Sequence, residues 1–173
     1  MSEQASNPTN KSFLSPIGFQ FSMQRLPHVN YFCTSAEIPA VSLGQTQTET
    51  PFVRLPQPGD KLAYTDFTLR FRVDEDLKNF REIYDWLTGI GYPDNFGQRQ
   101  TLARTAYSAG NVFSDGSLII TTSAYTPNIE VKFKDMYPIS LSTVAFNIEE
   151  TDVTYVQADV SFAYRSFELI SIQ

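Results

Sequence analysis

The chain contains one histidine and one cysteine, His28 and Cys33, and this pair has the residue types for nucleophilic catalysis. A cysteine nucleophile needs a base within hydrogen-bond reach. The two residues are five positions apart, and an odd separation on one continuous strand places side chains on opposite faces, so a dyad needs a bulge between them. We therefore expect Cys33 to be a small buried hydrophobic residue and His28 to lie on the surface.

Carboxylates that are able to exchange protons with a substrate occur at Asp74 and Asp76, at Glu149 and Glu150, and at Asp135. Each group has a structural explanation, because the first lies at an expected helix start, the second in a polar turn and the third after a strand. The sequence contains neither a glycine-rich phosphate-binding motif nor the Gly-x-Ser-x-Gly motif of a nucleophilic serine. We predict that the protein is not an enzyme and binds no cofactor.

The composition excludes several kinds of site. With 42% hydrophobic and 14% aromatic residues, the 173 residues can bury one sizeable core. A single cysteine and a single histidine form neither a disulfide framework within the chain nor a closed zinc site. The 13 Lys and Arg against 19 Asp and Glu give a net charge of −6, which argues against tight nucleic-acid binding. We expect no membrane span, because no run of eighteen apolar residues occurs, and no export signal.

The elements that would position these residues are mostly strands. Apolar and polar residues alternate most clearly over 67–73, the pattern of a strand with one buried face. The other expected strands or extended stretches are 19–23, 30–37, 41–50, 118–122, 129–133, 144–148 and 156–164. We count roughly seven strands, with an acidic turn at 149–152 joining the last two. The prediction is a mainly β fold of the α+β class, an antiparallel β-sandwich or barrel with one flanking helix.

The flanking helix is expected from about Glu75 to Ile90, with Asp74 as its N-cap. Its apolar residues recur at helical spacing, and acids occupy its first turn, where the helix dipole favours negative charge. The glycines and the proline of 89–93 are typical of a helix end. The next segment, 92–116, shows no sustained period, so we expect an irregular loop that closes in a turn at 114–117.

The N-terminal residues 1–12 are polar and show no apolar period, so we expect a flexible arm. It precedes a single domain that spans 13–173.

The segment 41–61 has an unusual composition. Its threonines at alternate positions suit a strand, whereas the prolines that follow exclude a central strand but fit an edge strand or a projecting loop. Phe52, Val53 and Leu55 lie among the prolines and have little local core to enter. Two interpretations are open: a proline-stiffened surface loop tucked against its own domain, or a projecting arm or hairpin that a neighbouring subunit covers.

Two regions match one known family in the order and spacing of their elements. The first begins at Pro58-Gly59-Asp60-Lys61 and continues through the strand 67–73 into Asp74-Glu75-Asp76 and a helix with Asp85-Trp86. The second contains 129–133 and Met136-Tyr137-Pro138-Ile139-Ser140, and it ends with a hairpin that reaches Tyr164. Over about 19–170 the chain resembles the tail tube proteins of contractile-tailed bacteriophages, which are related to the inner-tube proteins of type VI secretion.

This resemblance implies a structural virion protein: six copies form a ring of the tail tube, and stacked rings form a passive conduit for DNA ejection. The implied partners are further copies of the chain, the tail sheath, and baseplate or neck proteins. DNA passes through the lumen without specific binding, and no membrane is involved. The implied location is the virion tail, after synthesis in the host cytoplasm.

The same resemblance makes two sets of residues candidate sites. The candidates for a strand that lines the lumen are Thr46, Thr48 and Thr50, and those for the subunit interface are Phe52, Val53, Arg54 and Leu55. The arm and the 92–116 loop depart from the common tube pattern, which leaves open a tube initiator, a baseplate ring or a tail terminator. A monomeric β-sandwich accessory module that binds a ligand is the alternative outside this family.

Overall fold

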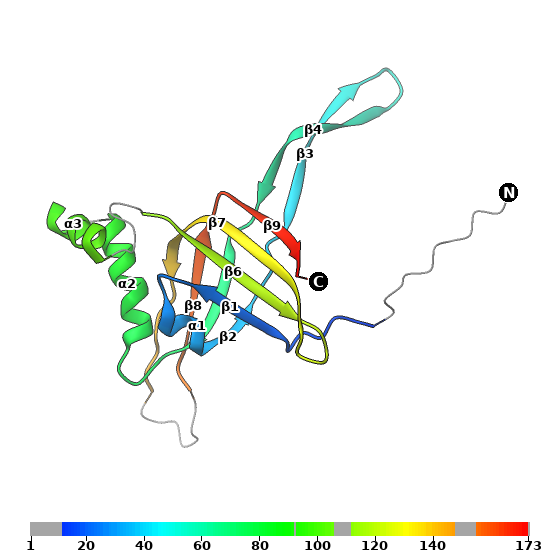
Figure 1. Cartoon of the computed structure of the whole chain (residues 1–173). Coiled ribbons are helices and arrows are strands. Elements are labelled where there is room, and N and C mark those ends of the chain that lie inside the picture. The colour runs from blue at the N-terminus through cyan, green and yellow to red at the C-terminus, as the bar shows by residue number, and fades with distance from the viewer. Residues whose placement is uncertain (1–11, 92, 106–111, 148–154, 173) are drawn as a thin grey trace.

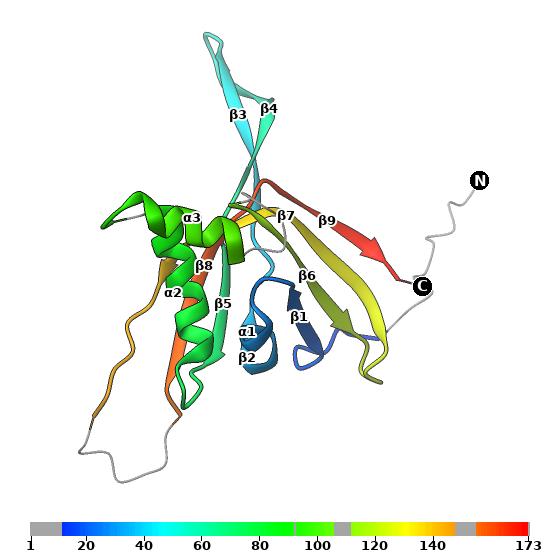
Figure 2. The same cartoon turned by 60° about the vertical axis from the view of Figure 1, so that its left-hand side comes forward.

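The structure of the protein, a computed structural model, describes residues 12–91, 93–105, 112–147 and 155–172. Figures 1 and 2 show a β-sheet body with helices along one side and a long two-stranded hairpin that projects from the body. Within the described residues the elements are, in chain order, β1 (Phe19–Met23), α1 (Pro27–Phe32), β2 (Cys33–Ala36), β3 (Val41–Glu49), β4 (Arg54–Tyr64), β5 (Phe67–Arg72), α2 (Lys78–Gly91), α3 (Phe96–Thr105), β6 (Ser114–Thr121), β7 (Pro127–Leu141), β8 (Gln157–Ala163) and β9 (Ser166–Ser171). The predicted mainly β, antiparallel fold is confirmed.

Seven strands form one sheet in the order β1-β6-β7-β8-β5-β2, with β9 paired to β7. The long strand β7 belongs to both halves of this sheet: residues 129–134 lie between β6 and β9, and residues 137–141 pair with β8. The strand bends between these parts at Asp135, whose φ is 56° and whose backbone N–H donates to Asp115 Oδ1 at 3.0 Å. This bend lets the two halves of the sheet lie on opposite sides of one core.

The core is aromatic and joins strands that are distant in the sheet order. Phe21 of β1 and Phe67 of β5 are four strands apart in that order, yet their ring centroids are 5.5 Å apart. The Phe133 ring of β7 lies 4.6 Å from that of Phe67. From α2, Ile83 and Trp86 are buried against the same cluster. The strongly curved sheet and α2 therefore enclose one hydrophobic core, as the alternation of the strands predicts.

The start of α2 differs from the prediction in one respect. The helix spans Lys78–Gly91 rather than Glu75–Ile90, because Leu77 N–H donates to Asp74 O at 2.9 Å and Leu77 has a φ of 56°. The acids therefore lie in a turn before the helix, and Asp74 is not its N-cap. The fully buried Asn79 organises this turn: its Oδ1 accepts from Asp74 N–H at 3.2 Å, and its Nδ2 donates to the Arg72 carbonyl at 2.7 Å.

Two further helices occupy segments that were predicted differently. Helix α1 takes the first part of the expected extended stretch 30–37 and leaves β2 for the rest. Helix α3 lies in the expected irregular loop 92–116, and the expected turn at 114–117 is the beginning of β6. The described residues thus contain three helices instead of one. The sequence of α3 has little apolar periodicity, which is why a reading of periodicity misses it.

The C-terminal strands also differ from the prediction. Strand β7 continues through the segment 135–138 that was expected to end it, and residues 144–147 form no strand. Strand β9, which was not predicted, pairs with β7, so the described residues contain nine strands rather than roughly seven. Residue 148, the expected turn at 149–152 and residues 1–11 of the expected arm lie outside the described residues.

The projecting hairpin is anchored to the body at its base. Tyr164 Oη donates to the Thr65 carbonyl at 2.8 Å, and the Tyr64 ring lies 6.0 Å from that of Tyr164 and 5.7 Å from that of Phe167. The pairing of Ala40 with Thr65 closes the hairpin at the same point. Burial raises the pKa of Tyr164 to about 12, and the neighbouring Tyr64 and Asp66 add to this shift.

We predict that Tyr164 makes stability fall in alkaline solution. The folded protein holds the Tyr164 proton to higher pH than the unfolded chain, in which a tyrosine has a pKa of about 10. The stability that this residue contributes is therefore complete below pH ~10 and is lost as the pH rises toward 12. Urea denaturation between pH 8 and pH 11.5 should show a steeper decline for the wild type than for Tyr164→Phe. Equal declines would contradict this role.

Candidate subunit interface

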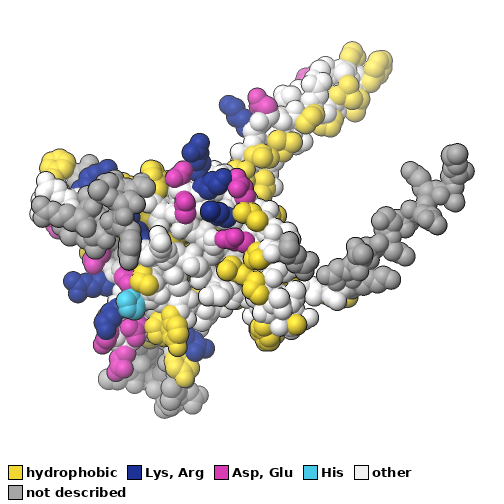
Figure 3. Space-filling view, in the orientation of Figure 1, with side chains coloured by type: hydrophobic (Ala, Val, Ile, Leu, Met, Phe, Trp, Pro, Cys, Tyr) yellow, Lys and Arg dark blue, Asp and Glu magenta, His cyan; other side chains and the backbone are white. Residues whose placement is uncertain are grey.

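The β3–β4 hairpin is a separate two-stranded sheet that projects away from the body (Figures 1 and 2). Every residue of β3 is exposed, and so is every residue of β4 except Gly59, which is half-buried. An isolated two-stranded hairpin is marginally stable in water at best. Figure 3 shows hydrophobic side chains along the hairpin and at its tip. Of the two interpretations, the segment therefore takes the projecting form and is not a loop tucked against its own domain.

Cross-strand partners in an antiparallel pair point to the same face, so the register sorts the hairpin side chains. One face carries a cluster of apolar residues beside the body, which we call the base face: Val41 opposite Tyr64, and Leu43 opposite Leu62. The other face carries Ser42, Thr46, Thr48, Leu55, Gln57 and Ala63, and we call it the threonine face. The base face is apolar and partly exposed, whereas the six residues that the register places on the threonine face are uncharged.

Two glycines allow the strands to approach closely in the middle of the hairpin. Between the pairs Leu43–Leu62 and Gln45–Pro58, β3 advances by two residues and β4 by four, so Gly59, Asp60 and Lys61 form a bulge opposite Gly44. A Cβ on Gly59 would lie 2.5 Å from the Gly44 carbonyl oxygen and 2.9 Å from its carbonyl carbon. Only glycine fits this position, and the bulge sets the direction of the outer half of the hairpin.

The tip of the hairpin is an ordered turn. Thr50 Oγ1 accepts a hydrogen bond from Val53 N–H at 3.1 Å, and Thr50 N–H donates to the Val53 carbonyl at 3.3 Å. This turn presents Phe52 with 97% of its surface exposed. Thr50 thus holds the turn and does not extend the row of Thr46 and Thr48 on β3.

The structure places the predicted site residues together on the hairpin but divides them differently. Leu55, an interface candidate, lies opposite Thr48 on the threonine face. Arg54 lies opposite Glu49 on the other face, and its Nε is 3.3 Å from Glu49 Oε1. Phe52 and Val53 occupy the tip. Of the interface candidates, Leu55 therefore shares a face with the lumen candidates Thr46 and Thr48, and the cross-strand register decides this.

The base face is the part of this surface that the sequence analysis missed. Its residues alternate with polar or small ones at 41–43 and 62–64, and this two-residue period is the signal that identifies them. Each run is only three residues long, and a segment rich in threonine and proline separates the two runs. Because Tyr64 packs on Tyr164 and Phe167, the base face continues the aromatic core outward onto the hairpin.

The reactive residues form no catalytic arrangement. His28 Nδ1 lies 2.5 Å from Glu82 Oε1, while Cys33 Sγ donates to the Ser35 carbonyl at 3.8 Å, so His28 does not activate the thiol. Burial raises the pKa of Cys33 to about 11, which leaves almost no thiolate at neutral pH. In the described part of the chain, no three His, Cys, Asp or Glu residues group in a way that suits a metal ion. None of the helices there has the length and apolar character needed to cross a membrane.

Two basic residues on the outer sheet faces, Arg70 and Lys134, are paired with acids. Arg70 holds Asp159 through two bonds, of 2.6 and 3.1 Å, and these raise the pKa of the Arg70 guanidinium. Lys134 bonds to Glu168 on β9. A face that grips phosphates needs unpaired cations. Cations that are paired in this way are less available to phosphate groups.

Comparisons with known proteins agree with this fold. A sequence profile of the family described as phage tail tube protein matches residues 4–169. No curated protein sequence shows significant similarity to the chain.

Solved structures with the same fold come from contractile systems. The protein is similar to a chain of the sheath–tube complex of the extracellular contractile injection system PVC in its extended state. The TM-score is 0.64 at 14% identity, over 94% of each chain. It is also similar to the tube-terminating cap of the anti-feeding prophage, with a TM-score of 0.63 at 14% identity over 99% of each chain. A chain of the anti-feeding prophage baseplate matches at a TM-score of 0.59 and 8% identity, over 90% of this chain and 92% of that one.

At these identities the structural matches establish the fold, and the profile establishes the family, because it covers nearly the whole chain. The resemblance stated from the sequence is thereby confirmed. The chain belongs to the phage tail tube protein family, and it is a structural component of a tail tube rather than an enzyme.

Proposed function

We propose that six copies of this protein form a ring, that the rings stack into a tube, and that the tube is a passive conduit for DNA during ejection. The observation that carries this proposal is the projecting hairpin. Its base face carries four apolar side chains beside the body: Tyr64 packs on Tyr164 and Phe167, while about half of the surface of Val41, Leu43 and Leu62 stays exposed among the described residues. A neighbouring copy in the ring covers this face and so removes the apolar surface from water.

The threonine face fits a lumen wall. Thr46, Thr48 and Gln57 are uncharged, exposed polar residues, and the chain as a whole has a net charge of −6. A basic wall would hold DNA by releasing counterions and would slow its passage. We therefore assign Thr46 and Thr48 to the lumen. We assign the tip residues Phe52 and Val53, with Leu55 beside the tip at the outer end of the threonine face, to contacts with an adjacent ring.

The proposed partners other than the chain itself are a tail sheath around the tube and baseplate or neck proteins at its ends. The structurally similar assemblies are a sheath–tube complex, a tube-terminating cap and a baseplate, which supports these partners. The proposed location is the virion tail, after synthesis in the host cytoplasm.

A pair of substitutions on opposite hairpin faces tests this assignment. Leu43→Asp should prevent ring formation, because the ring would bury an unpaired carboxylate on the base face. Thr46→Asp, which places the same carboxylate on the threonine face, should still form rings and tubes. Electron microscopy of the full chain shows rings and their symmetry, and circular dichroism checks that each variant is folded.

Three outcomes would contradict the proposal. Rings from Leu43→Asp that are as abundant as those of the wild type would show that the base face does not lie in the subunit interface. Loss of rings in Thr46→Asp would show that the threonine face does not line the lumen. Wild-type particles with a symmetry other than six-fold would exclude the hexamer.

A further inference from the structure

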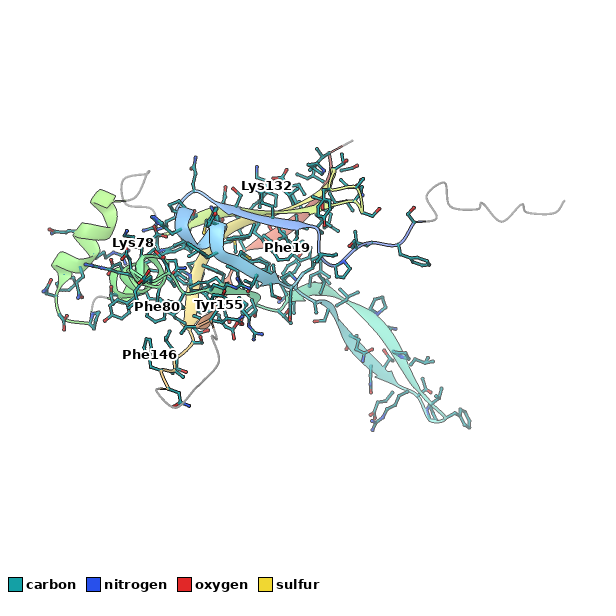
Figure 4. The ribbon with its side chains drawn as sticks, turned by 90° about the horizontal axis from the view of Figure 1, so that it is seen from below. Phe19, Lys78, Phe80, Lys132, Phe146 and Tyr155 are labelled. Atoms are coloured by element: carbon teal, nitrogen blue, oxygen red, sulfur yellow. The ribbon has the colours of Figure 1, made fainter. Side chains whose placement is uncertain are left out.

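The end of the molecule opposite the hairpin exposes a second group of aromatic residues. Phe146 and Tyr155 flank the connection between β7 and β8, and 79% of Phe146 and 66% of Tyr155 is exposed. Figures 1 and 2 both place the described residues on its two sides, 142–147 and 155–156, at the far end of the body from the hairpin. Figure 4 labels the Phe146 and Tyr155 side chains. We call Phe146 and Tyr155 the lower aromatic pair.

The lower aromatic pair rests on ordered elements. Arg72, the last residue of β5, places its guanidinium 4.7 Å from the centre of the Tyr155 ring. The backbone beside Tyr155 is held to β5, because Val73 N–H donates to the Val156 carbonyl at 2.9 Å. On the other side, Val144 packs against the core two residues before Phe146. Both aromatic side chains therefore extend outward from an end of the sheet that is held by backbone hydrogen bonding and core packing.

We infer that the hairpin tip of one copy docks on the lower aromatic pair of a second copy in the next ring. This inference rests on the proposed function and names the surface that receives the tip. Phe52 at one end and the lower aromatic pair at the other are uncharged aromatic groups on opposite ends of one chain. A contact between different surfaces of two identical copies does not close on itself, so it repeats as an open stack with one direction.

The area of this contact decides when it forms. Phe52, Val53 and Leu55 offer on the order of 400 Å² of side-chain surface, of which the Phe ring supplies about half. A stable pair of proteins buries about 800 Å² on each partner, so one tip is too small to hold two free copies together. Six tips between two rings bury roughly 2,400 Å² on one side and act together. Stacking therefore requires assembled rings.

Cross-linking in the full chain tests the contact. In a Cys33→Ala background, a variant with Phe52→Cys and Phe146→Cys should give a ladder of covalent multimers in assembled tubes with a short bis-maleimide reagent. The matched control is Phe52→Cys with Tyr125→Cys, since Tyr125 is an exposed aromatic residue of the β6–β7 turn. It should give no ladder, because Tyr125 does not belong to the lower aromatic pair on which the tip docks. Unassembled protein at the same concentration should give no ladder from either variant, because one tip contact is too small.

Substitutions with charge give a second measurement. Phe146→Asp and Phe52→Asp should each leave rings intact and reduce stacked tubes at least tenfold in electron micrographs, whereas Tyr125→Asp should not. Tubes without a 52–146 ladder, or with a ladder only in the Tyr125 control, would overturn the inference and leave the ring proposal standing. If the wild type forms neither rings nor tubes in any condition that concentrates it, the proposed function itself fails.

Discussion

Gly59→Ala is expected to abolish tube assembly while the body of the protein remains folded. The added Cβ would lie 2.5 Å from the Gly44 carbonyl oxygen, a distance at which backbone atoms must move. The strands then separate at the bulge, and the outer half of the hairpin, including Phe52, points in another direction. Because the hairpin is a sheet of its own, the unfolding midpoint of the body should change little.

The neighbouring glycine supplies a matched control for this result. A Cβ on Gly44 would meet only the Lys61 carbonyl oxygen, at 3.6 Å, which is ordinary van der Waals contact. Gly44→Ala should therefore assemble like the wild type. Electron microscopy counts the tubes and urea denaturation measures the stability of both variants. Tubes from Gly59→Ala in normal number would show that the direction of the hairpin does not control assembly.

Phe133→Ala is expected to destabilise the fold by about 3–5 kcal/mol. The Phe133 ring is fully buried, and its centroid lies 4.6 Å from that of Phe67 and 5.2 Å from that of Tyr164. Removing it leaves a cavity where the two halves of the sheet meet and weakens the support of Tyr164 at the hairpin base. The free energy of unfolding, measured in urea, should show the loss.

Phe52→Ala is the control for this core substitution. It removes the same side chain from a position that is 97% exposed, so the stability of the unassembled protein should stay within about 0.5 kcal/mol of the wild type. A loss at Phe133 of less than 1 kcal/mol would mean that the site collapses around the smaller side chain, and that the aromatic cluster is not the centre of the core.

The elements with a clear local period are predictable from the sequence, and the elements stabilised mainly by neighbours are not. The strand Phe67–Arg72 forms where the alternation predicts it, since each apolar residue there has a core to enter. Strand β9 shows no clean alternation, because Leu169 and Ile170 are both apolar, and pairing with β7 decides its structure. Helix α3 likewise has little apolar periodicity and lies against α2 (Figure 2).

The hairpin surface could likewise be predicted from the sequence only in part, because some of its features depend on pairing between strands. The prolines after position 50 exclude a central strand, which is a local property of their backbone. The segment does form an edge strand, whose one partner among the described residues is β3. The face that Leu55 occupies depends on the tip turn and on the two extra residues of the bulge. Those determine the cross-strand register, which periodicity along one strand does not contain.

One cysteine, one histidine, a net charge of −6 and alternating strands that need a shared core can all be read from the amino-acid sequence. These properties exclude zinc and disulfide frameworks and favour a structural β protein, because composition limits which chemistry a chain can perform. Which apolar residues remain exposed depends on the fold, because burial depends on contacts between distant segments. The base face, the tip and the lower aromatic pair are among the surfaces that those contacts leave exposed.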